Sequence, residues 1–239
     1  MSHLRGRERA KYVEKMFSTI AVRYDLLNSI MTGHLHHRWR RKAVNLGINE
    51  LTGISLDVAT GTGDFAIELL RYPKISHVIG IDFSPNMLRI AKEKTNKNGV
   101  GAKTTFLLGD AIKLPFASES FVSVTSGFSL RNFIDVAGSL KEMNRVTQPG
   151  GRLVILEITP MRNKGIFSKL FHFYFDRIVP LIGALMAKDR EAYTYLPESV
   201  KNFPDAKQLA IMIEQAGWVG VTYEKIGMGS VAIHLGRKI

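Results

Sequence analysis

Short apolar stretches alternate with amphipathic stretches between residues 55 and 158. The short stretches predict buried strands, whereas apolar positions that recur every three or four residues predict helices. Because the connections are short, the alternation predicts parallel strands with helices on both faces of one sheet. The predicted strands are 55–59, 77–82, 104–108, 121–127 and 151–158, and the predicted helices between them lie near 64–71, 85–97 and 134–147.

Two further patterns flank this alternation. Residues 8–30 and 205–216 have apolar positions at helical spacing. Residues 218–225 and 230–237 predict two strands joined by a glycine-rich connection, which is typical of an antiparallel hairpin. We therefore predict an α/β fold with one domain over residues 1–239, whose seven-stranded sheet has five parallel strands and a C-terminal antiparallel hairpin.

The remaining segments should cover this sheet. Residues 1–50 predict an N-terminal helical cap, and residues 160–204 predict a helical, aromatic lid inserted before the last strands. The aromatic and apolar stretch 166–187 of this lid is interrupted by Lys169, Asp176 and Arg177. Its uninterrupted apolar run, 178–187, is much shorter than the roughly 20 residues that span a bilayer. We expect the lid to pack on the domain or to face a lipid-like ligand, and not to cross a membrane.

Composition and charge narrow the classes of protein. A hydrophobic content of 45% supports a packed core, and the absence of cysteine excludes disulfides, zinc–thiolate sites and cysteine nucleophiles. The net charge is +12, of which residues 1–50 carry +6, with ten basic against four acidic residues. Such an excess suits nucleic acid or an anionic membrane surface, or belongs to a solvated face. Because no nucleic-acid-binding motif accompanies it, we expect no nucleic-acid partner.

The first residues do not form the apolar core of a secretory signal. We therefore expect a cytoplasmic chain that makes peripheral contact with the inner face of a membrane. The sequence leaves the oligomeric state open and allows a homo-oligomer.

Three histidines, His34, His36 and His37, lie close together in the polar stretch 31–41. Imidazoles at this spacing occur in many metal sites, but no carboxylate or thiolate stands nearby in the sequence. We therefore predict an irregular, solvated basic loop here, and we predict no metal site.

A glycine turn follows the first strand of the alternating region. Residues 57–66 read DVATGTGDFA, with Gly61 and Gly63 in the turn, and Asp82 ends the next strand. A Gly-x-Gly turn between a strand and a helix, followed by an acid on the second strand, is typical of nucleotide binding. The turn also matches the dinucleotide motif, so a nicotinamide-dependent oxidoreductase is a competing interpretation.

Charge around the turn separates these two interpretations. Asp57 and Asp64 flank it, and a pyrophosphate at that helix start would need free N–H groups and no nearby anion. Two carboxylates favour a ligand with ammonium and sulfonium charges, which is S-adenosylmethionine. Asp82 would then accept hydrogen bonds from the ribose hydroxyls, and Asp110 would accept one from the adenine amine.

Each of these acids alone could be a helix cap or a turn former. Together with the two glycines they share one property, because all stand at the carboxyl ends of predicted strands, where open α/β sheets bind ligands. The set consists of Asp57, Gly61, Gly63, Asp82 and Asp110.

Three further motifs carry a resemblance over nearly the whole chain. They read FxxIAxxYDxxNS at 17–29, GFSLRN followed by LKEMxRVxxPGG within 127–151, and YLxxSxxxFP at 195–204. With the glycine turn, these motifs resemble those of class I methyltransferases. More narrowly, they resemble those of the ubiquinone/menaquinone biosynthesis C-methyltransferase family, which includes demethylmenaquinone methyltransferases. The resemblance implies a Rossmann-like sheet and S-adenosylmethionine as cofactor.

The resemblance also implies roles at matching positions. The implied cofactor contacts are Thr62, Asp82, Asp110 and Ala111, with Gly127 lining the same pocket. Ser129 departs from the family, which usually has glycine there, and many relatives have asparagine at the position of Asp110. The implied substrate is a polyprenylated hydroquinone, either demethylmenaquinol or its ubiquinone-precursor counterpart, and the sequence does not choose between them.

Candidate catalytic residues follow from the chemistry of carbon methylation. A ring carbon becomes nucleophilic when the adjacent hydroxyl loses its proton, and Arg131 could stabilise the phenolate or polarise a water, although guanidinium is a poor base. Asn132 could position the ring oxygens, and Tyr24 and Asp25 lie on a helix that could close over the cofactor. The aromatic residues 167–175, with Tyr193 and Tyr195, could wall the ring and tail.

Other interpretations stay open for these residues and for the chain. Arg131 could form a structural ion pair, Tyr24 and Asp25 could pack and cap a helix, and the aromatic segment could be ordinary core. The chain could instead methylate another lipid or small molecule, or be a non-catalytic cofactor-binding subunit of a biosynthetic complex.

Overall fold

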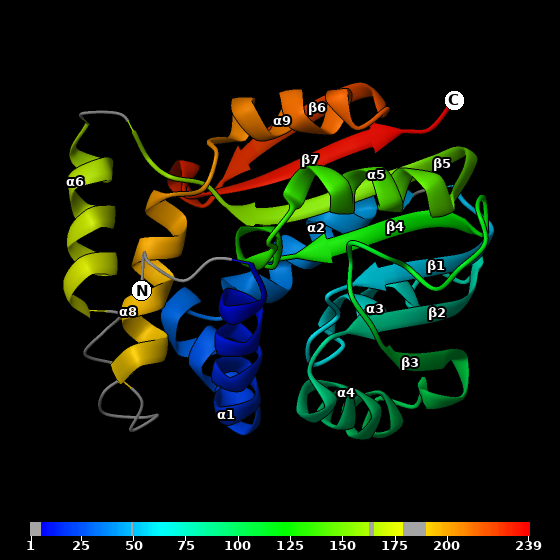
Figure 1. The fold of residues 1–239 in the computed structure, drawn as a ribbon, viewed down its shortest axis with the longest axis horizontal. Coiled ribbons are helices and arrows are strands. Elements are labelled where there is room, and N and C mark those ends of the chain that lie inside the picture. The colour runs from blue at the N-terminus through cyan, green and yellow to red at the C-terminus, as the bar shows by residue number, and fades with distance from the viewer. Residues whose placement is uncertain (1–5, 49, 163–164, 179–189) are drawn as a thin grey trace.

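The structure, a computed structural model, describes residues 6–48, 50–162, 165–178 and 190–239. Seven strands in this part of the chain form a sheet in the order β3-β2-β1-β4-β5-β7-β6 (Figure 1). The strands are β1 (Gly53–Val58), β2 (Ile75–Asp82), β3 (Thr104–Leu108), β4 (Phe121–Gly127), β5 (Thr147–Ile158), β6 (Val219–Ile226) and β7 (Val231–Arg237).

The pairing confirms the predicted fold class. Strands β1 to β5 pair in parallel, whereas β7 is antiparallel to both β5 and β6. The order reverses between β1 and β4, and a reversal of this kind opens a crevice at the carboxyl ends of the strands. In Figure 1 these ends point towards α1, with α8 and α6 beyond it.

The α-helices in the described part of the chain are α1 (Gly6–Thr32), α2 (Leu35–Ile48), α3 (Asp64–Leu69), α4 (Pro85–Lys97), α5 (Val136–Val146), α6 (Ile166–Phe173), α8 (Arg190–Lys201) and α9 (Ala206–Gln215). Helices α2, α3, α4, α5 and α9 pack on the sheet, whereas α1, α6 and α8 lie beyond the carboxyl ends of its parallel strands (Figure 1). Short helical turns occur at Gly101–Lys103, Leu130–Asn132, Tyr174–Ile178 and Gly227–Gly229.

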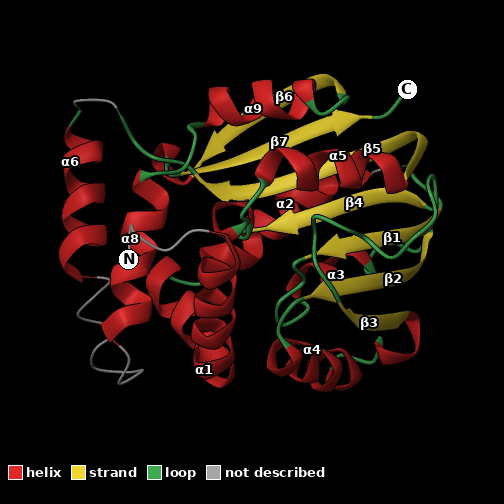
Figure 2. Ribbon diagram, in the orientation of Figure 1, coloured by secondary structure: helices red, strands yellow, loops and turns green. Residues whose placement is uncertain are grey.

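Strand β5 shows why the strands read as continuous apolar runs. Leu153 and Ile155 belong to the core formed with α5 and α9, whereas Val154 and Leu156 belong to the core formed with α2 and α3. Figure 2 shows these two pairs of helices on opposite sides of the sheet. Successive side chains point to opposite faces of a sheet. A strand that is buried on both faces therefore shows no alternation of polar and apolar residues.

The N-terminal region differs from its prediction. Helix α1 continues to Thr32 and α2 begins at Leu35, so the stretch 31–41 is almost entirely helical and is not an irregular loop. Gly33 and His34 make the turn between the helices, with φ of 55° and 63°. Two polar residues of this stretch, His36 and Arg40, are buried in α2, where His36 Nε2 lies 3.1 Å from Ser29 Oγ of α1 and Arg40 pairs with Asp64 of α3.

The lid contains α6, the helical turn after it and α8. Most of the apolar run 178–187 lies outside the described residues. In the parts of the chain that the structure describes, no helix combines the length and the apolar character needed to cross a bilayer.

Candidate active site

Two cavities meet at the carboxyl edge of the parallel strands. The smaller has a volume of about 40 Å³ and lies between the glycine turn and α1, and the larger, which is mostly apolar, has a volume of about 530 Å³. Four residues line both cavities: Phe17, Tyr24, Phe128 and Asn132. A group bound in one cavity is therefore next to a group bound in the other.

The glycine turn forms one wall of the small cavity. Gly61 has φ of 55° there, and a Cβ built on it would meet no heavy atom within 4 Å, so this backbone is open to a ligand. Gly63 has φ of 82°, which favours glycine, and it caps α3. At Gly127, on the opposite wall, a Cβ would lie 2.4 Å from the ring of Phe65. Glycine is needed there by packing.

Asp82 is the one carboxylate among the described residues that line the small cavity. Its Oδ2 accepts the N–H of Gly61 at 2.8 Å, and its Oδ1 accepts the N–H of Ser84 at 2.9 Å. Burial raises the pKa of Asp82 to about 6, although these backbone N–H groups act in the opposite direction. Strand β2 thus places an acceptor at the turn, as the sequence predicts.

Asp57 lies beneath the turn and lines neither cavity. Its carboxylate accepts hydrogen bonds from the hydroxyls of Thr60 at 2.6 Å and Thr125 at 2.7 Å. Burial raises the pKa of Asp57 to about 7. Its position supports the turn from within the core.

The negative charge of Asp64 is also compensated by neighbouring cations. It forms ion pairs with Arg40, at 3.2 Å, and with Lys94. Burial would raise the pKa of Asp64, but these two cations outweigh it and lower the pKa to about 2. The charge argument drawn from the sequence is therefore wrong in its premise, because the two acids that flank the turn are buried or compensated.

Thr62 and Asp25 meet each other rather than a cavity. Thr62 Oγ1 donates to Asp25 Oδ1 at 2.6 Å, and neither residue lines a cavity. Asp110 is exposed, with its Oδ1 accepting the N–H of Ile112 at 3.1 Å, and Ala111 packs against the core beneath α5. The structure does not bring Asp110 and Ala111 to the small cavity, and their cofactor roles remain predictions.

Arg131 lines the large cavity but is held by an acid that the sequence reasoning missed. Its Nη1 donates to Oε1 of Glu157 at 2.7 Å, and both side chains are buried. Glu157 lies near the end of β5, and its Oε1 also accepts the N–H of Ile158 at 2.8 Å. The available signal was a single acid directly after the apolar run 153–156.

The other predicted catalytic residues lie between the cavities or in their walls. Asn132 Oδ1 accepts the hydroxyl of Tyr195 at 3.1 Å, and the ring of Tyr24 packs edge-on against Phe17. Ser129 lines the small cavity, where its Oγ lies 2.5 Å from that of Ser126. The described aromatic residues of the lid that line the large cavity are Phe171, Phe173, Tyr174, Phe175 and Tyr195, and the side chains of Phe167 and Tyr193 lie outside the described part.

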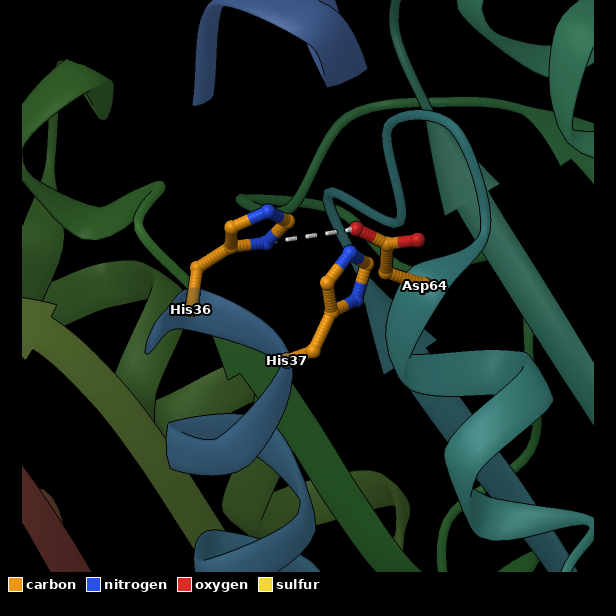
Figure 3. A group of neighbouring side chains, drawn as sticks. All are labelled: His36, His37 and Asp64. Atoms are coloured by element: carbon orange, nitrogen blue, oxygen red, sulfur yellow. Dashed lines mark ion pairs between the residues drawn. The ribbon is translucent and has the colours of Figure 1, made fainter. Parts of the chain in front are cut away.

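Two of the three histidines come together with Asp64 (Figure 3). His36 is buried in α2 and lines the large cavity, so the expectation of a solvated loop is wrong for it. Its Nδ1 lies 2.6 Å from Arg40 Nη1, so this nitrogen accepts a hydrogen bond. Burial, followed by the charge of Arg40, lowers the pKa of His36 to about 3. Because Arg40 and Lys94 already compensate Asp64, the surrounding charge does not favour a metal cation.

Solved structures share this fold. One is a SAM-dependent methyltransferase from Thermotoga maritima, described as a possible histamine N-methyltransferase, with a TM-score of 0.66, 20% identity and coverage of 94% of this chain and 99% of that one. Another is the [4+2]-cyclase SpnF, with a TM-score of 0.70, 17% identity and coverage of 95% and 94%. The fold is therefore that of the S-adenosylmethionine-dependent methyltransferases, and SpnF shows that the fold alone does not determine the reaction.

The sequence relatives make the assignment narrower. The ubiE/COQ5 methyltransferase family matches residues 5–238, and this chain belongs to that family. The demethylmenaquinone methyltransferase of Roseiflexus sp. (strain RS-1) is 42% identical, covering 97% of this chain and 95% of the relative. That of Thermus thermophilus is 44% identical, covering 93% and 100%. The ubiquinone/menaquinone biosynthesis C-methyltransferase of Geotalea daltonii is 38% identical, covering 97% and 98%.

Proposed function

We propose that this methyltransferase uses S-adenosylmethionine to methylate a ring carbon of a prenylated hydroquinone. The observation that carries the proposal is the meeting of a small cavity at the glycine turn with a large apolar cavity, across four shared residues. The small cavity supplies acceptors and open backbone for a nucleoside. The large one supplies an apolar enclosure for a ring and tail.

The residues present fit the proposed cofactor. Gly61 offers open backbone and Asp82 offers a buried carboxylate for hydroxyl groups, while Gly127 lines the opposite wall, where packing against Phe65 requires glycine. These residues would hold the adenosyl part. When bound, S-adenosylmethionine supplies an electrophilic methyl group on a sulfonium centre.

The large cavity suits the acceptor. Its volume of about 530 Å³ lies within the roughly 300–1,000 Å³ typical of ligand sites. Apolar side chains dominate its walls, among them Met16, Ile20, Leu27, Met31 and Leu170. Burial of a prenyl tail against such walls is favourable, at about 25 cal/mol for each Å² of apolar surface removed from water.

Arg131 supplies the charged group in this wall. Glu157 fixes the position of this guanidinium, and its positive charge stabilises the phenolate formed when the hydroxyl proton leaves. Asn132 and Tyr24, between the cavities, hold the ring against the cofactor side. Alignment of two bound reactants is worth up to about 7–11 kcal/mol of the barrier.

The relatives named above are demethylmenaquinone and ubiquinone/menaquinone methyltransferases, so both ring systems enter the test. Purified protein would be incubated with labelled methyl donor and, separately, prenylated demethylnaphthoquinol and demethylbenzoquinol. We expect label in one or both products. Binding of S-adenosylhomocysteine without transfer to either would favour another acceptor or a non-catalytic subunit.

We also propose that α6 contacts an anionic membrane surface. Ile166, Leu170 and Phe173 recur at helical spacing and are 77%, 59% and 59% exposed, and Leu170 and Phe173 also line the large cavity. Lys169 and Arg177 are exposed beside them. Apolar side chains flanked by basic ones favour such a surface, and the net charge of +12 acts in the same direction.

A further inference from the structure

A network of charged side chains lies beside the glycine turn, and none of its members lines either cavity. It joins four elements: α1 through Asp25, α2 through Arg40, the turn and the start of α3 through Thr62 and Asp64, and α4 through Lys94. Two carboxylates and two cations balance one another. The network therefore connects the N-terminal helices to the turn without net charge.

Lys94 contacts the three residues at which α1 meets the glycine turn and the start of α3, which are Asp25, Thr62 and Asp64. We call this meeting point the α1–turn junction. Lys94 Nζ donates to Asp25 Oδ2 at 2.6 Å, to Asp64 Oδ1, and to Thr62 Oγ1 at 3.4 Å. The side chain is 22% exposed, so the pairs are only partly screened by water. Without this ammonium group, the carboxylate of Asp25 would lose its cation and would face the carboxylate of Asp64 across the junction.

The position of α1 determines the shape of both cavities. Phe17 and Tyr24 belong to this helix and line both of them, and Tyr24 is the neighbour of Asp25. A second contact holds the helix two turns earlier, where Ser18 Oγ lies 3.0 Å from Ser84 Oγ. The junction at Asp25 is thus an attachment of α1 directly beside Tyr24.

The volume of the small cavity makes this attachment relevant to binding. At about 40 Å³ it is far below the roughly 300 Å³ at the lower end of ligand sites. A volume this small makes the fit of an adenosyl group sensitive to the spacing between the walls of the cavity. The turn and α1 are two of these walls, and Lys94 bridges them from outside the cavity.

We propose that Lys94 is a positioning residue for cofactor binding. It holds Asp25, and with it α1, against the glycine turn, so that Phe17 and Tyr24 close over the bound adenosyl group. This inference rests on the proposed function, which supplies the identity of the ligand.

The test compares Lys94→Met with Lys94→Arg in the full-length chain, using S-adenosylhomocysteine as the probe in calorimetry. The control is Lys97→Met, because Lys97 is an exposed residue of the same helix. We expect Lys94→Met to weaken binding about fivefold or more, the lower end of typical coupling between sites. Lys94→Arg should restore most of the affinity, and the control should equal the wild type.

Two further measurements separate positioning from general stability. Asp25→Asn added to Lys94→Met should cost little more, because both changes break one link. In hydrogen exchange, the probe should protect the amides of residues 17–28 in the wild type but not in Lys94→Met, while protection of β1 and β4 is unchanged. If Lys94→Met does not fold, Asp25→Asn alone takes its place in both measurements.

The outcomes are distinct. Equal affinity and equal protection of α1 in the wild type and Lys94→Met would overturn the role of Lys94 and leave the proposed function standing. A wild-type protein that does not bind the probe would overturn the proposed function, and the role of Lys94 with it.

Discussion

Arg131 Nη1 donates to Glu157 Oε1 at 2.7 Å within the wall of the large cavity. The contact links the short helical turn after β4 to the end of β5, and Glu157 Oε2 also accepts the N–H of Arg131 at 3.3 Å. Glu157 is 1% exposed, so its charge depends on this arginine for compensation. One contact therefore serves both the fold and the chemistry.

The first prediction concerns stability. Arg131→Ala would leave the Glu157 carboxylate buried and unpaired, which should lower the free energy of unfolding by about 3–5 kcal/mol. Urea unfolding measures this, with Arg152→Ala as the control, because Arg152 is an exposed residue of β5 whose loss should cost about 0.5 kcal/mol or less. Equal stabilities of the two variants would show that the ion pair contributes nothing.

The second prediction concerns turnover, for which Arg131→Lys is the cleaner change. Lysine keeps the charge opposite Glu157 but loses the planar set of donors. We expect turnover on a prenylated quinol to fall about 10²–10³-fold, as for other lost donors to a developing oxyanion, with the affinity for S-adenosylhomocysteine retained. Wild-type turnover would remove Arg131 from the mechanism.

The third prediction concerns Asp82 and pH. Its pKa is raised to about 6, so the carboxylate loses its charge, and part of its strength as an acceptor, as the pH falls through 6. The affinity for S-adenosylhomocysteine should fall up to about tenfold per pH unit below 6, the limit for one linked proton. Asp82→Asn should bind more weakly and without this dependence. A flat profile in the wild type would argue against a role for the ionised carboxylate.

The fourth prediction concerns Asp57 and the pH dependence of stability. Because its pKa is raised to about 7 in the folded chain, the folded state binds more protons than the unfolded state between the ordinary pKa near 3.8 and 7. Stability must therefore fall as the pH rises through this window. The fall, followed by urea unfolding at several pH values, should be smaller in Asp57→Asn. Parallel curves for the two proteins would contradict the shift.

The fifth prediction concerns α6. Replacement of Ile166 and Leu170 by serine should reduce sedimentation with anionic vesicles, because it removes the exposed apolar side chains. Ile211→Ser is the matched control, since Ile211 is a 43% exposed residue of α9. Wild-type binding should also weaken with added salt. If the control loses as much binding as the α6 variant, α6 is not the contact surface.

Local pattern was sufficient for the frame of the molecule. Apolar runs, short connections and a glycine-rich hairpin predicted the five parallel strands, the antiparallel pair and the edge at which Asp82 stands, since each depends on neighbours in the sequence. The motifs around residues 17–29 and 127–151 similarly indicated the family that the comparison confirms.

The charges of the site were determined by the tertiary structure. Nothing near Asp64 in the sequence shows that Arg40 and Lys94 compensate it, and nothing near Arg131 shows that Glu157 holds it. The same holds for α2, where the polar residues His36 and Arg40 are buried and have partners in α1 and α3. Periodicity reports local conformation, whereas burial and pairing depend on which distant segments the fold brings together, and these set the charge of an ionisable group.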